Sequence, residues 1–487
     1  MVIEPEGAER GCPADGRSIA EHSSLHDHRY ISHYITMGPK TGNNYWWKQA
    51  RIYELYIDKF ADTVQGLIGN LDYFAKLGVN CLHLLPHYPS PMVDDGYDVS
   101  DYTNVRESLG TLEDFQELLL AAHVRDIRII IDFVANHTSD THPWFVQARS
   151  SRDNPWRKYY LWSETGRGFA MAQNGMPDVK QSNWVWNEAT KDYYFATYYP
   201  NQPDLNWDYL AVYEEMIAIM KFWADMGVDG FRLDAIPHLV KREGTNCTGL
   251  PETHALIKRL RRRLDEGYPQ TILIAEARSD IATMKQYFGN GDECHMAYHF
   301  LLMEEMWAAI YRGNTEHLKK IIGDSLDIPE NCQWAIFLRN HDELALGLIE
   351  PETHQELLKF LDTDQKYLYQ RGERTSVRIG QVFKGDRARS LEALKMLYSL
   401  PGAPIMYYGD EIGMGNLVHD PDILDTRKYV RGSFDWEQAK RQLKDPESLF
   451  NAVSKLMHDK TAEIVHIEKI ENTPESSASS RRDPIIE

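Results

Sequence analysis

Three acidic residues end runs of apolar residues: Asp234 in GFRLDA, Glu276 in IAEA and Asp342 in RNHDE. A carboxylate in such a place is costly unless it faces a cleft in which its charge is used. Two carboxyl groups about 5–5.5 Å apart can cleave a glycosidic bond with retention, one attacking the anomeric carbon and one protonating the departing oxygen. Any one of the three could instead be a surface or capping carboxylate. Together they indicate such chemistry on a sugar.

Short apolar or β-branched runs recur along the chain and alternate with amphipathic stretches. Near-continuous apolar runs are typical of parallel strands covered by helices. Eight of them predict an α/β fold, a closed (β/α)8 TIM barrel whose active site lies at the C-terminal ends of the strands. The three carboxylates end the fourth, fifth and seventh runs. The candidate strands are residues 51–60, 79–86, 128–137, 228–235, 271–277, 295–300, 333–342 and 404–411.

The spacing of these strands predicts the domain organisation. About 90 residues separate the third strand from the fourth, far more than one helix needs, and the stretch is rich in Trp, Tyr, Asn, Pro and Gly. We therefore expect a barrel over 46–137 and 207–460, with a small irregular domain, 138–206, inserted in one loop. A second excursion, about 344–387, is predicted to be helical and charged. Residues 1–45 are interpreted as a polar leader, and 461–487 as a short strand (462–470) followed by a polar tail.

The composition narrows the class of protein. A formal charge of −20 over 487 residues makes a nucleic-acid surface improbable, because phosphate binding needs clustered Lys and Arg. The five cysteines are scattered and form no CxxC pair, which favours a reducing compartment over a disulfide framework or zinc site. The first residues contain no apolar stretch typical of a signal peptide, and no run is long enough to span a membrane. These features favour a cytoplasmic protein with a small neutral substrate.

Five ordered segments carry a family resemblance: GYDVSDY (96–102), DFVANH (132–137), GFRLDA (230–235), the short AEA around Glu276, and NHDE (340–343). They resemble the successive signature segments of the α-amylase family, glycoside hydrolase family 13, and the likeness runs from about residue 46 to 414. The resemblance implies a (β/α)8 barrel with a small domain after the third strand, where the spacing independently predicts one. It implies no cofactor for the chemistry.

Carried over by segment, the resemblance assigns the three carboxylates. Asp234 corresponds to the nucleophile, Glu276 to the acid/base, and Asp342 to the carboxylate that grips sugar hydroxyls in the transition state. Arg232 lies two residues before Asp234, hence on the same face of the strand. A cation there would keep the nucleophile ionised, although an ordinary barrel salt bridge is the alternative.

Four further residues correspond to the family's sugar-binding groups. His137 and His341 resemble the pair that binds hydroxyls, although a lone His is more often simply packed. Tyr97 resembles the aromatic platform under the cleaved glucose. Asp98 resembles the residue that holds the far hydroxyls of that glucose, which would favour removal of one glucose from the non-reducing end.

A narrower resemblance concerns the reaction. Residues 202–207, 235–254, 291–300, 337–344 and 400–415 are similar to trehalose synthases, which convert maltose to trehalose by intramolecular glucosyl transfer. Residues 419–436 are instead similar to amylosucrases, which use sucrose, with Arg427 and Arg431 as candidate substrate-binding residues. A charged loop before the last barrel helix is the alternative.

The expected substrate is thus maltose, trehalose or sucrose. An α-glucosidase or sucrose-type transglucosidase, or a non-catalytic relative, are the competing interpretations. The β-sandwich usual in this family is expected to be absent or truncated.

A structural calcium is the one metal that the resemblance suggests. Asn136 and Asp204 match positions that bind calcium in many relatives, and hard oxygen ligands suit that ion. Lys241, however, stands where trehalose synthases tend to carry a glutamate ligand. Its ammonium could take the place of the cation.

Overall fold

Eight parallel strands close into a barrel in the computed structural model, which describes residues 45–459. Their order around the barrel is β1–β14–β10–β9–β8–β7–β3–β2. Each strand overlaps one of the eight predicted segments, so the TIM barrel is confirmed. The strands are β1 (Ile52–Leu55), β2 (Cys81–Leu84), β3 (Arg128–Val134), β7 (Gly230–Asp234), β8 (Ile272–Ala275), β9 (Met296–Tyr298), β10 (Gln333–Ile336) and β14 (Ala403–Tyr407).

The register of three neighbouring strands sets the level of the carboxylates. Val134 on β3 pairs with Asp234 on β7, and Leu233 pairs with Ala275 on β8. Glu276, the next residue along, donates its backbone N–H to the carbonyl of Leu233 at 3.3 Å. Asp234 and Glu276 therefore lie side by side at the C-terminal edge of the barrel, where loops of such folds build their sites.

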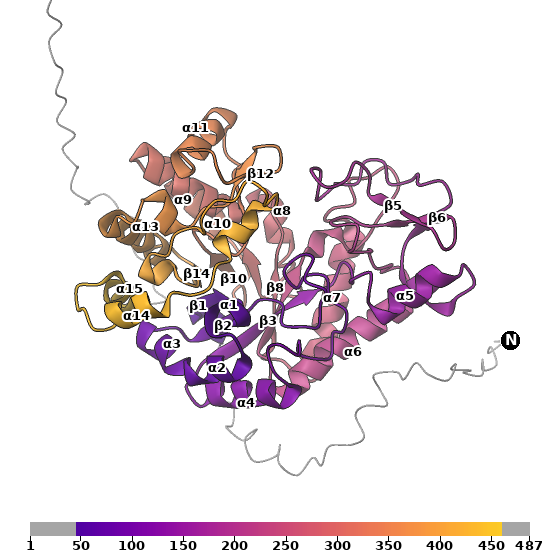
Figure 1. Cartoon of the computed structure of the whole chain (residues 1–487), viewed down its shortest axis with the longest axis horizontal. Helices are drawn as coiled ribbons and strands as arrows, with labels where there is room; N and C mark the ends of the chain where they lie inside the picture. Colours follow the sequence, from indigo (N-terminus) through magenta and orange to yellow (C-terminus); the bar gives the residue numbers. More distant parts are fainter. Residues whose placement is uncertain (1–44, 460–487) are drawn as a thin grey trace, which may run out of the picture.

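Helices form the outer layer around the barrel strands (Figure 1). Their ends follow ordinary capping chemistry; in α4, for example, Thr111 and Asp114 form a reciprocal capping box. The helices that follow the barrel strands are α1 (Ile57–Ala61), α2 (Val64–Gly69), α3 (Leu71–Leu77), α4 (Leu112–His123), α6 (Leu210–Met226), α7 (Pro251–Asp265), α8 (Ile281–Gln286), α9 (Phe300–Arg312), α10 (Glu316–Ser325), α12 (Ile379–Val382), α13 (Arg387–Ser399), α14 (Trp436–Gln442) and α15 (Leu449–Asp459).

The long segment between β3 and α6 contains helix α5 (Pro143–Ser150) and a three-stranded antiparallel sheet. The sheet has the order β4–β6–β5, with β4 at Trp162–Ser163, β5 at Trp184–Asn187 and β6 at Asp192–Phe195. It stands beside the barrel at the right of Figure 1. Its aromatic residues pack on one another, as in the stack of Phe145 on Trp162, whose ring centroids are 5.9 Å apart.

The segment after β10 differs from the helical excursion predicted for it. Besides helix α11 (Pro351–Leu361) it contains a second antiparallel sheet of order β11–β13–β12, made of β11 (Leu344–Ala345), β12 (Leu368–Tyr369) and β13 (Arg374–Thr375). Between β12 and β13 the chain turns through Gln370, Arg371 and Gly372, all with positive φ. Two-residue strands carry too little sequence pattern to be recognised, so that part of the prediction was wrong.

Three other predictions concern membrane spans, the cysteines and the two ends of the chain. Within residues 45–459, no helix is long and apolar enough to cross a membrane. The four cysteines of this part of the chain are buried and unpaired. The polar leader up to residue 44 and the predicted strand and tail after 460 lie outside the described residues.

Candidate active site

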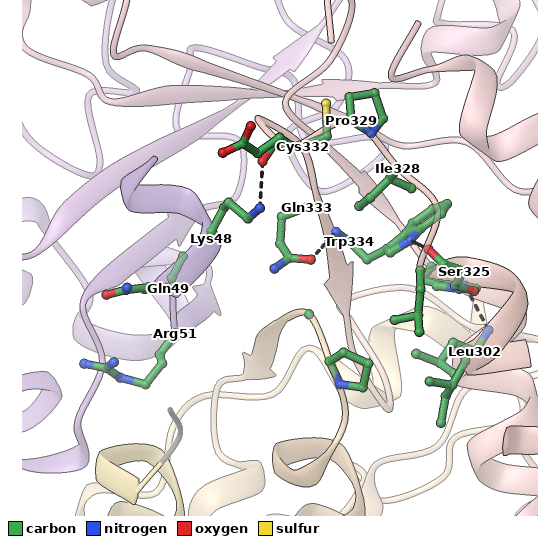
Figure 2. Close-up of a pocket in the computed structure, with 17 residues that line it drawn as sticks. Lys48, Gln49, Arg51, Leu302, Ser325, Ile328, Pro329, Cys332, Gln333 and Trp334 are labelled. Atoms are coloured by element: carbon green, nitrogen blue, oxygen red, sulfur yellow. Dashed lines mark hydrogen bonds between the residues drawn. The ribbon is translucent and has the colours of Figure 1, made fainter. Parts of the chain in front are cut away.

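A pocket of about 240 Å³ opens at the C-terminal edge of the barrel, and all three predicted carboxylates line it. Tyr97, His137 and Arg427 also line it, so six of the predicted residues meet there. A larger cavity, about 530 Å³, lies at the opposite end of the barrel (Figure 2). That cavity is lined by residues before or at the start of β1, β10 and β14 and by residues of helices α9 and α10, and Glu330 is its single acidic residue. The smaller pocket is therefore the one equipped for glycosidic chemistry.

Arg232 joins the two central carboxylates. Its Nη1 lies 2.7 Å from Asp234 Oδ1, and its Nη2 lies 2.5 Å from Glu276 Oε1. Burial raises the pKa of both carboxyls, the guanidinium opposes that rise, and repulsion by Glu276 further raises the pKa of Asp234. Two carboxyls so placed titrate as a pair. A pair that shares one proton supplies a nucleophile and an acid together.

Asp342 is held in its ionised form. Its Oδ1 accepts from Arg431 Nη2 at 2.7 Å, and its Oδ2 lies 3.1 Å from His341 Nε2. Burial by itself would raise the pKa of Asp342, but His341 and the two arginines Arg431 and Arg427 lower it well below its usual value. A permanent carboxylate in the pocket wall suits a group that accepts hydrogen bonds from sugar hydroxyls.

Tyr97 forms the floor next to these carboxylates, and His341 lies beneath it. Their rings are stacked, with centroids 5.4 Å apart and planes inclined by 12°, and Tyr97 Oη lies 2.6 Å from His341 Nε2. His341 itself is covered by Tyr97 and does not line the pocket. His137 does line it, and its Nε2 lies 3.2 Å from the carbonyl oxygen of Tyr97. Burial lowers the pKa of His137 to about 4, so its ring is neutral near pH 7.

Asp98 does not face the pocket, contrary to the prediction. Its carboxylate accepts from Ser90 Oγ at 2.9 Å and from the backbone N–H groups of Val93 and Asp94 at 3.0 and 3.2 Å. It therefore fixes the loop that precedes Gly96. Asp94 lines the pocket in its place and accepts from Arg427 Nη2 at 2.7 Å. The acidic pair Asp94–Asp95 before Gly96 was the only sequence signal for this.

The two arginines of the last barrel loop, Arg427 and Arg431, are buried rather than solvated. Arg427 lines the pocket, whereas Arg431 lies behind it. Besides Asp342, Arg431 contacts Asp95 at 2.5 Å and donates to the carbonyl oxygen of His341 at 3.0 Å. The two side chains tie the end of the chain to the pocket wall.

The predicted calcium ligands bind an ammonium group. Lys241 Nζ lies 2.8 Å from Asn136 Oδ1 and 2.5 Å from Asp204 Oδ2, and it also contacts the carbonyl oxygen of His238. All three side chains are buried. Among residues 45–459, no cluster of three or more His, Cys, Asp or Glu side chains could hold a metal ion. A cation of the protein's own occupies the donor set, so these residues do not fit calcium.

Three further charged residues lie beneath the pocket and were not predicted: Glu54 on β1, His83 on β2 and Asp132 on β3. All are buried. Asp132 Oδ1 lies 2.6 Å from Arg232 Nη1, and its Oδ2 accepts from Tyr97 Oη at 3.1 Å. A lone glutamate within the apolar run RIYELYI was the available signal for Glu54.

Comparison with known proteins decides the family. The model of the α-amylase catalytic domain matches residues 42–353, more than half of the chain. The chain belongs to the α-amylase family. It is thus an enzyme of a family that acts on α-glucosides, and its barrel is the catalytic domain of that family.

Relatives within the α-amylase family give a finer likeness. The chain is 41% identical over 429 residues to the trehalose synthase/amylase TreS of Mycolicibacterium smegmatis. The aligned region covers 86% of this chain and 70% of that protein. It is 43% identical over 401 residues to the trehalose synthase of Thermus thermophilus, covering 81% of this chain and 41% of that protein. A solved structure of the trehalose-6-phosphate hydrolase of Bacillus licheniformis matches with a TM-score of 0.66 at 25% identity, over 85% of this chain and 83% of that one.

Proposed function

We propose that the protein interconverts maltose and trehalose through a covalent glucosyl-enzyme. The observation that carries this proposal is the pair Asp234 and Glu276, joined by one buried arginine in a pocket of only about 240 Å³. The likeness to two trehalose synthases at 41 and 43% identity supports the choice of reaction. The chain spans 41–70% of the length of these relatives, so their activity is assigned here as a proposal.

The first half-reaction uses both carboxyls. The Asp234 carboxylate attacks the anomeric carbon of the non-reducing glucose of maltose, and the bond from that carbon to the O4 of the second glucose breaks. Glu276 gives its proton to this departing oxygen. A glucosyl ester on Asp234, free glucose and the Glu276 carboxylate remain.

The second half-reaction reverses these roles. The freed glucose turns so that its anomeric hydroxyl faces the ester. Glu276 takes the proton of that hydroxyl while its oxygen attacks the anomeric carbon and Asp234 departs. Two inversions at one carbon give net retention, and the product is the α,α-1,1-linked disaccharide.

The charged residues of the pocket wall would hold the substrate in position. Asp342 would accept hydrogen bonds from hydroxyls of the reacting glucose, since it is held ionised by His341 and Arg431. The ion pair of Asp94 and Arg427 would hold the far hydroxyls, the role that the sequence suggested for Asp98. A wall closed by these two residues limits the pocket to a single glucosyl unit beyond the bond that is cleaved.

Retention of the freed glucose requires a cover over the pocket. The β12–β13 turn touches the inserted segment above it: Gln370 Nε2 donates to the carbonyl oxygen of Gly175 at 3.1 Å, and the N–H of Arg371 donates to Asp178 Oδ2 at 3.1 Å. Residues 173–176 and 369–370 are among those that line the pocket. Such a roof excludes water and favours transfer over hydrolysis.

Incubation with maltose, followed by chromatography of the sugars, tests the proposal. Trehalose is the expected product, with glucose as a minor one, and incubation with trehalose should regenerate maltose. Glucose alone would overturn the proposal in favour of an α-glucosidase, and turnover of sucrose but not maltose would favour an amylosucrase-like enzyme. The Asp234→Ala variant, purified in parallel and checked for fold by circular dichroism, must be inactive to exclude a contaminant.

A further inference from the structure

A chain of alternating charges runs through the barrel interior beneath the pocket, and Glu54 lies in its middle, between His341 and His83. We propose that Glu54 is a positioning residue for the glucosyl transfer: with His83 it fixes the place and the protonation of His341, and through His341 the carboxylate of Asp342. The inference rests on the proposed role of Asp342 in sugar binding.

One carboxylate oxygen of Glu54 holds His341 at two points. Glu54 Oε1 accepts the backbone N–H of His341 at 2.7 Å and lies 3.0 Å from His341 Nδ1. The residue after that backbone N–H is Asp342. Both the main chain that carries Asp342 and the imidazole that contacts it are thus fixed by the same group.

The other oxygen of Glu54 faces a second imidazole. Glu54 Oε2 lies 3.2 Å from His83 Nδ1, and Tyr298 Oη approaches it at 3.4 Å. On its far side His83 Nε2 lies 3.2 Å from Asp132 Oδ2. Since Asp132 also contacts Arg232 at 2.6 Å, the chain continues to the arginine that joins Asp234 and Glu276.

The contacts of His341 suit a protonated ring. Nδ1 faces Glu54 Oε1 at 3.0 Å, and Nε2 faces both Asp342 Oδ2 at 3.1 Å and Tyr97 Oη at 2.6 Å, so an imidazolium has an acceptor at each ring nitrogen. Tyr97 stacks on the ring, Tyr56 meets it edge-on, and Arg431 donates to its carbonyl oxygen.

The balance of charges agrees with this geometry. Burial alone would lower the pKa of His341, but Asp342 and Glu54 raise it to about 9. Burial likewise lowers the pKa of His83, and Asp132 and Glu54 raise it above its usual value. His341 and His83 in turn hold the pKa of Glu54 well below its usual range, against its burial.

The placement of this chain favours a role in function. A barrel interior filled with apolar side chains would be about as stable as one with buried ion pairs, because desolvation offsets most of the attraction between charges. The neighbouring residue on β1, Tyr53, faces the helices and packs on Phe60 and Phe74. Glu54 faces the opposite way, toward the carboxylates of the site. Charges are therefore buried on the side of β1 where they reach the pocket.

Glu54→Gln removes the charge and keeps the shape. We expect kcat to fall about tenfold or more with KM changed much less, because the transition state uses Asp342 more than the ground state does. The alkaline limb of the kcat–pH profile should move down by about one pH unit or more, since His341 loses a carboxylate that favours its charged form. A merely structural role would lower stability without moving this limb.

His83→Gln gives a prediction of opposite sign. The substitution removes the His83 ring on the other side of Glu54. Without the repulsion of that ring the imidazolium of His341 is more stable, so the alkaline limb should move up. Glu411→Gln is the matched control: Glu411 is buried and accepts from Tyr53 Oη at 2.7 Å, on the helix side of the same strand, outside the chain of charges. Its variant should keep the alkaline limb of the unmodified protein even if its Tm falls.

The inference would be overturned if the alkaline limb of Glu54→Gln stayed where it lies in the unmodified protein. It would also be overturned if the limbs of the Glu54 and His83 variants moved in the same direction. The profiles can be measured with p-nitrophenyl α-glucoside, whose hydrolysis uses the same carboxyls, so failure to make trehalose would not decide this point. Histidine-selective ¹⁵N NMR of the free protein, with the His341 signals identified by their loss in His341→Gln, tests it without turnover. Two protonated ring nitrogens near pH 7.5 are expected, and a neutral ring there would also refute it.

Discussion

Asp94 and Arg427, 333 residues apart in the sequence, form a buried ion pair in the pocket wall with 2.7 Å between Oδ1 and Nη2. Arg427 also reaches toward Asp342, at 3.5 Å. The loop after β2 and the loop after β14 are thereby joined at the point where the far end of a glucose would rest. The sequence alone does not show that Asp94 and Arg427 form a pair.

The first prediction follows from this pair. Asp94→Asn should lower kcat/KM for maltose by about 100-fold, because it loosens Arg427 and removes a hydrogen-bond acceptor for the sugar. Asp98→Asn is the control, since Asp98 is buried nearby but faces away from the pocket. It should lower Tm and leave kcat/KM within a few fold of the unmodified protein. Equal losses of kcat/KM in the two variants would contradict the placement of Asp94.

The second prediction concerns the roof over the pocket. Gln370→Ala removes the hydrogen bond to the carbonyl oxygen of Gly175, and Arg371→Ala removes the side-chain ion pair with Asp178 (Nε to Oδ1, 3.7 Å), so water should compete better for the glucosyl-enzyme. We expect the ratio of glucose to trehalose formed from maltose to rise about threefold or more while total turnover changes less. Lys366→Ala, on an exposed part of the same excursion, is the control and should leave the product ratio as it is.

The third prediction concerns acid stability. His87, His137, His142 and His299 are buried and His238 is partly buried, and desolvation lowers the pKa of each to about 3 or 4. The unfolded chain binds protons on these rings near pH 6.5, whereas the folded chain does so only at lower pH. Their contribution to the free energy of unfolding is therefore full above about pH 6.5 and falls as the pH drops toward 4. Tm measured across this range should decline steadily.

His87 offers a direct check of that cause. Its ring stacks on Phe115 with centroids 4.6 Å apart, and neither ring nitrogen has a hydrogen-bond partner. His87→Phe should raise Tm near neutral pH, because an unpartnered buried polar group is removed, and should flatten the decline toward pH 4. His317→Gln, an exposed substitution on α10, should leave the slope of Tm against pH unchanged. An unchanged slope in His87→Phe would show that other groups cause the decline.

The ends of strands were predictable from sequence, and that made the central carboxylates predictable too. Asp234 and Asp342 follow long apolar runs whose parallel packing leaves one polar edge, so their meeting follows from the topology. Arg232 could be placed on the same face as Asp234 by the two-residue period of a strand.

Choices between neighbouring residues in loops were not predictable. Whether Asp94 or Asp98 faces the pocket depends on the turn at Gly96, whose φ of 105° is read only from the structure. Glu54 and His83 were overlooked for a different reason: each lies within a short apolar strand, where a single polar residue carries no sign of its partner. Only the closure of the barrel brings Glu54 on β1 to His341 after β10.

The last prediction concerns calcium. Lys241 neutralises Asp204 and contacts Asn136 where relatives are expected to hold calcium, so neither EDTA nor added calcium should change Tm or turnover of the unmodified protein. Lys241→Met leaves Asp204 buried without a cation and should cost about 3–5 kcal/mol of stability. Lys241→Glu instead supplies a third oxygen ligand in place of the ammonium. Its Tm should be low in EDTA and rise with calcium in the millimolar range, whereas magnesium, which demands tighter octahedral geometry, should restore less. Thermal melts in EDTA, calcium and magnesium separate these cases, and a calcium-dependent Tm in the unmodified protein would mean that Lys241 does not occupy the cation position.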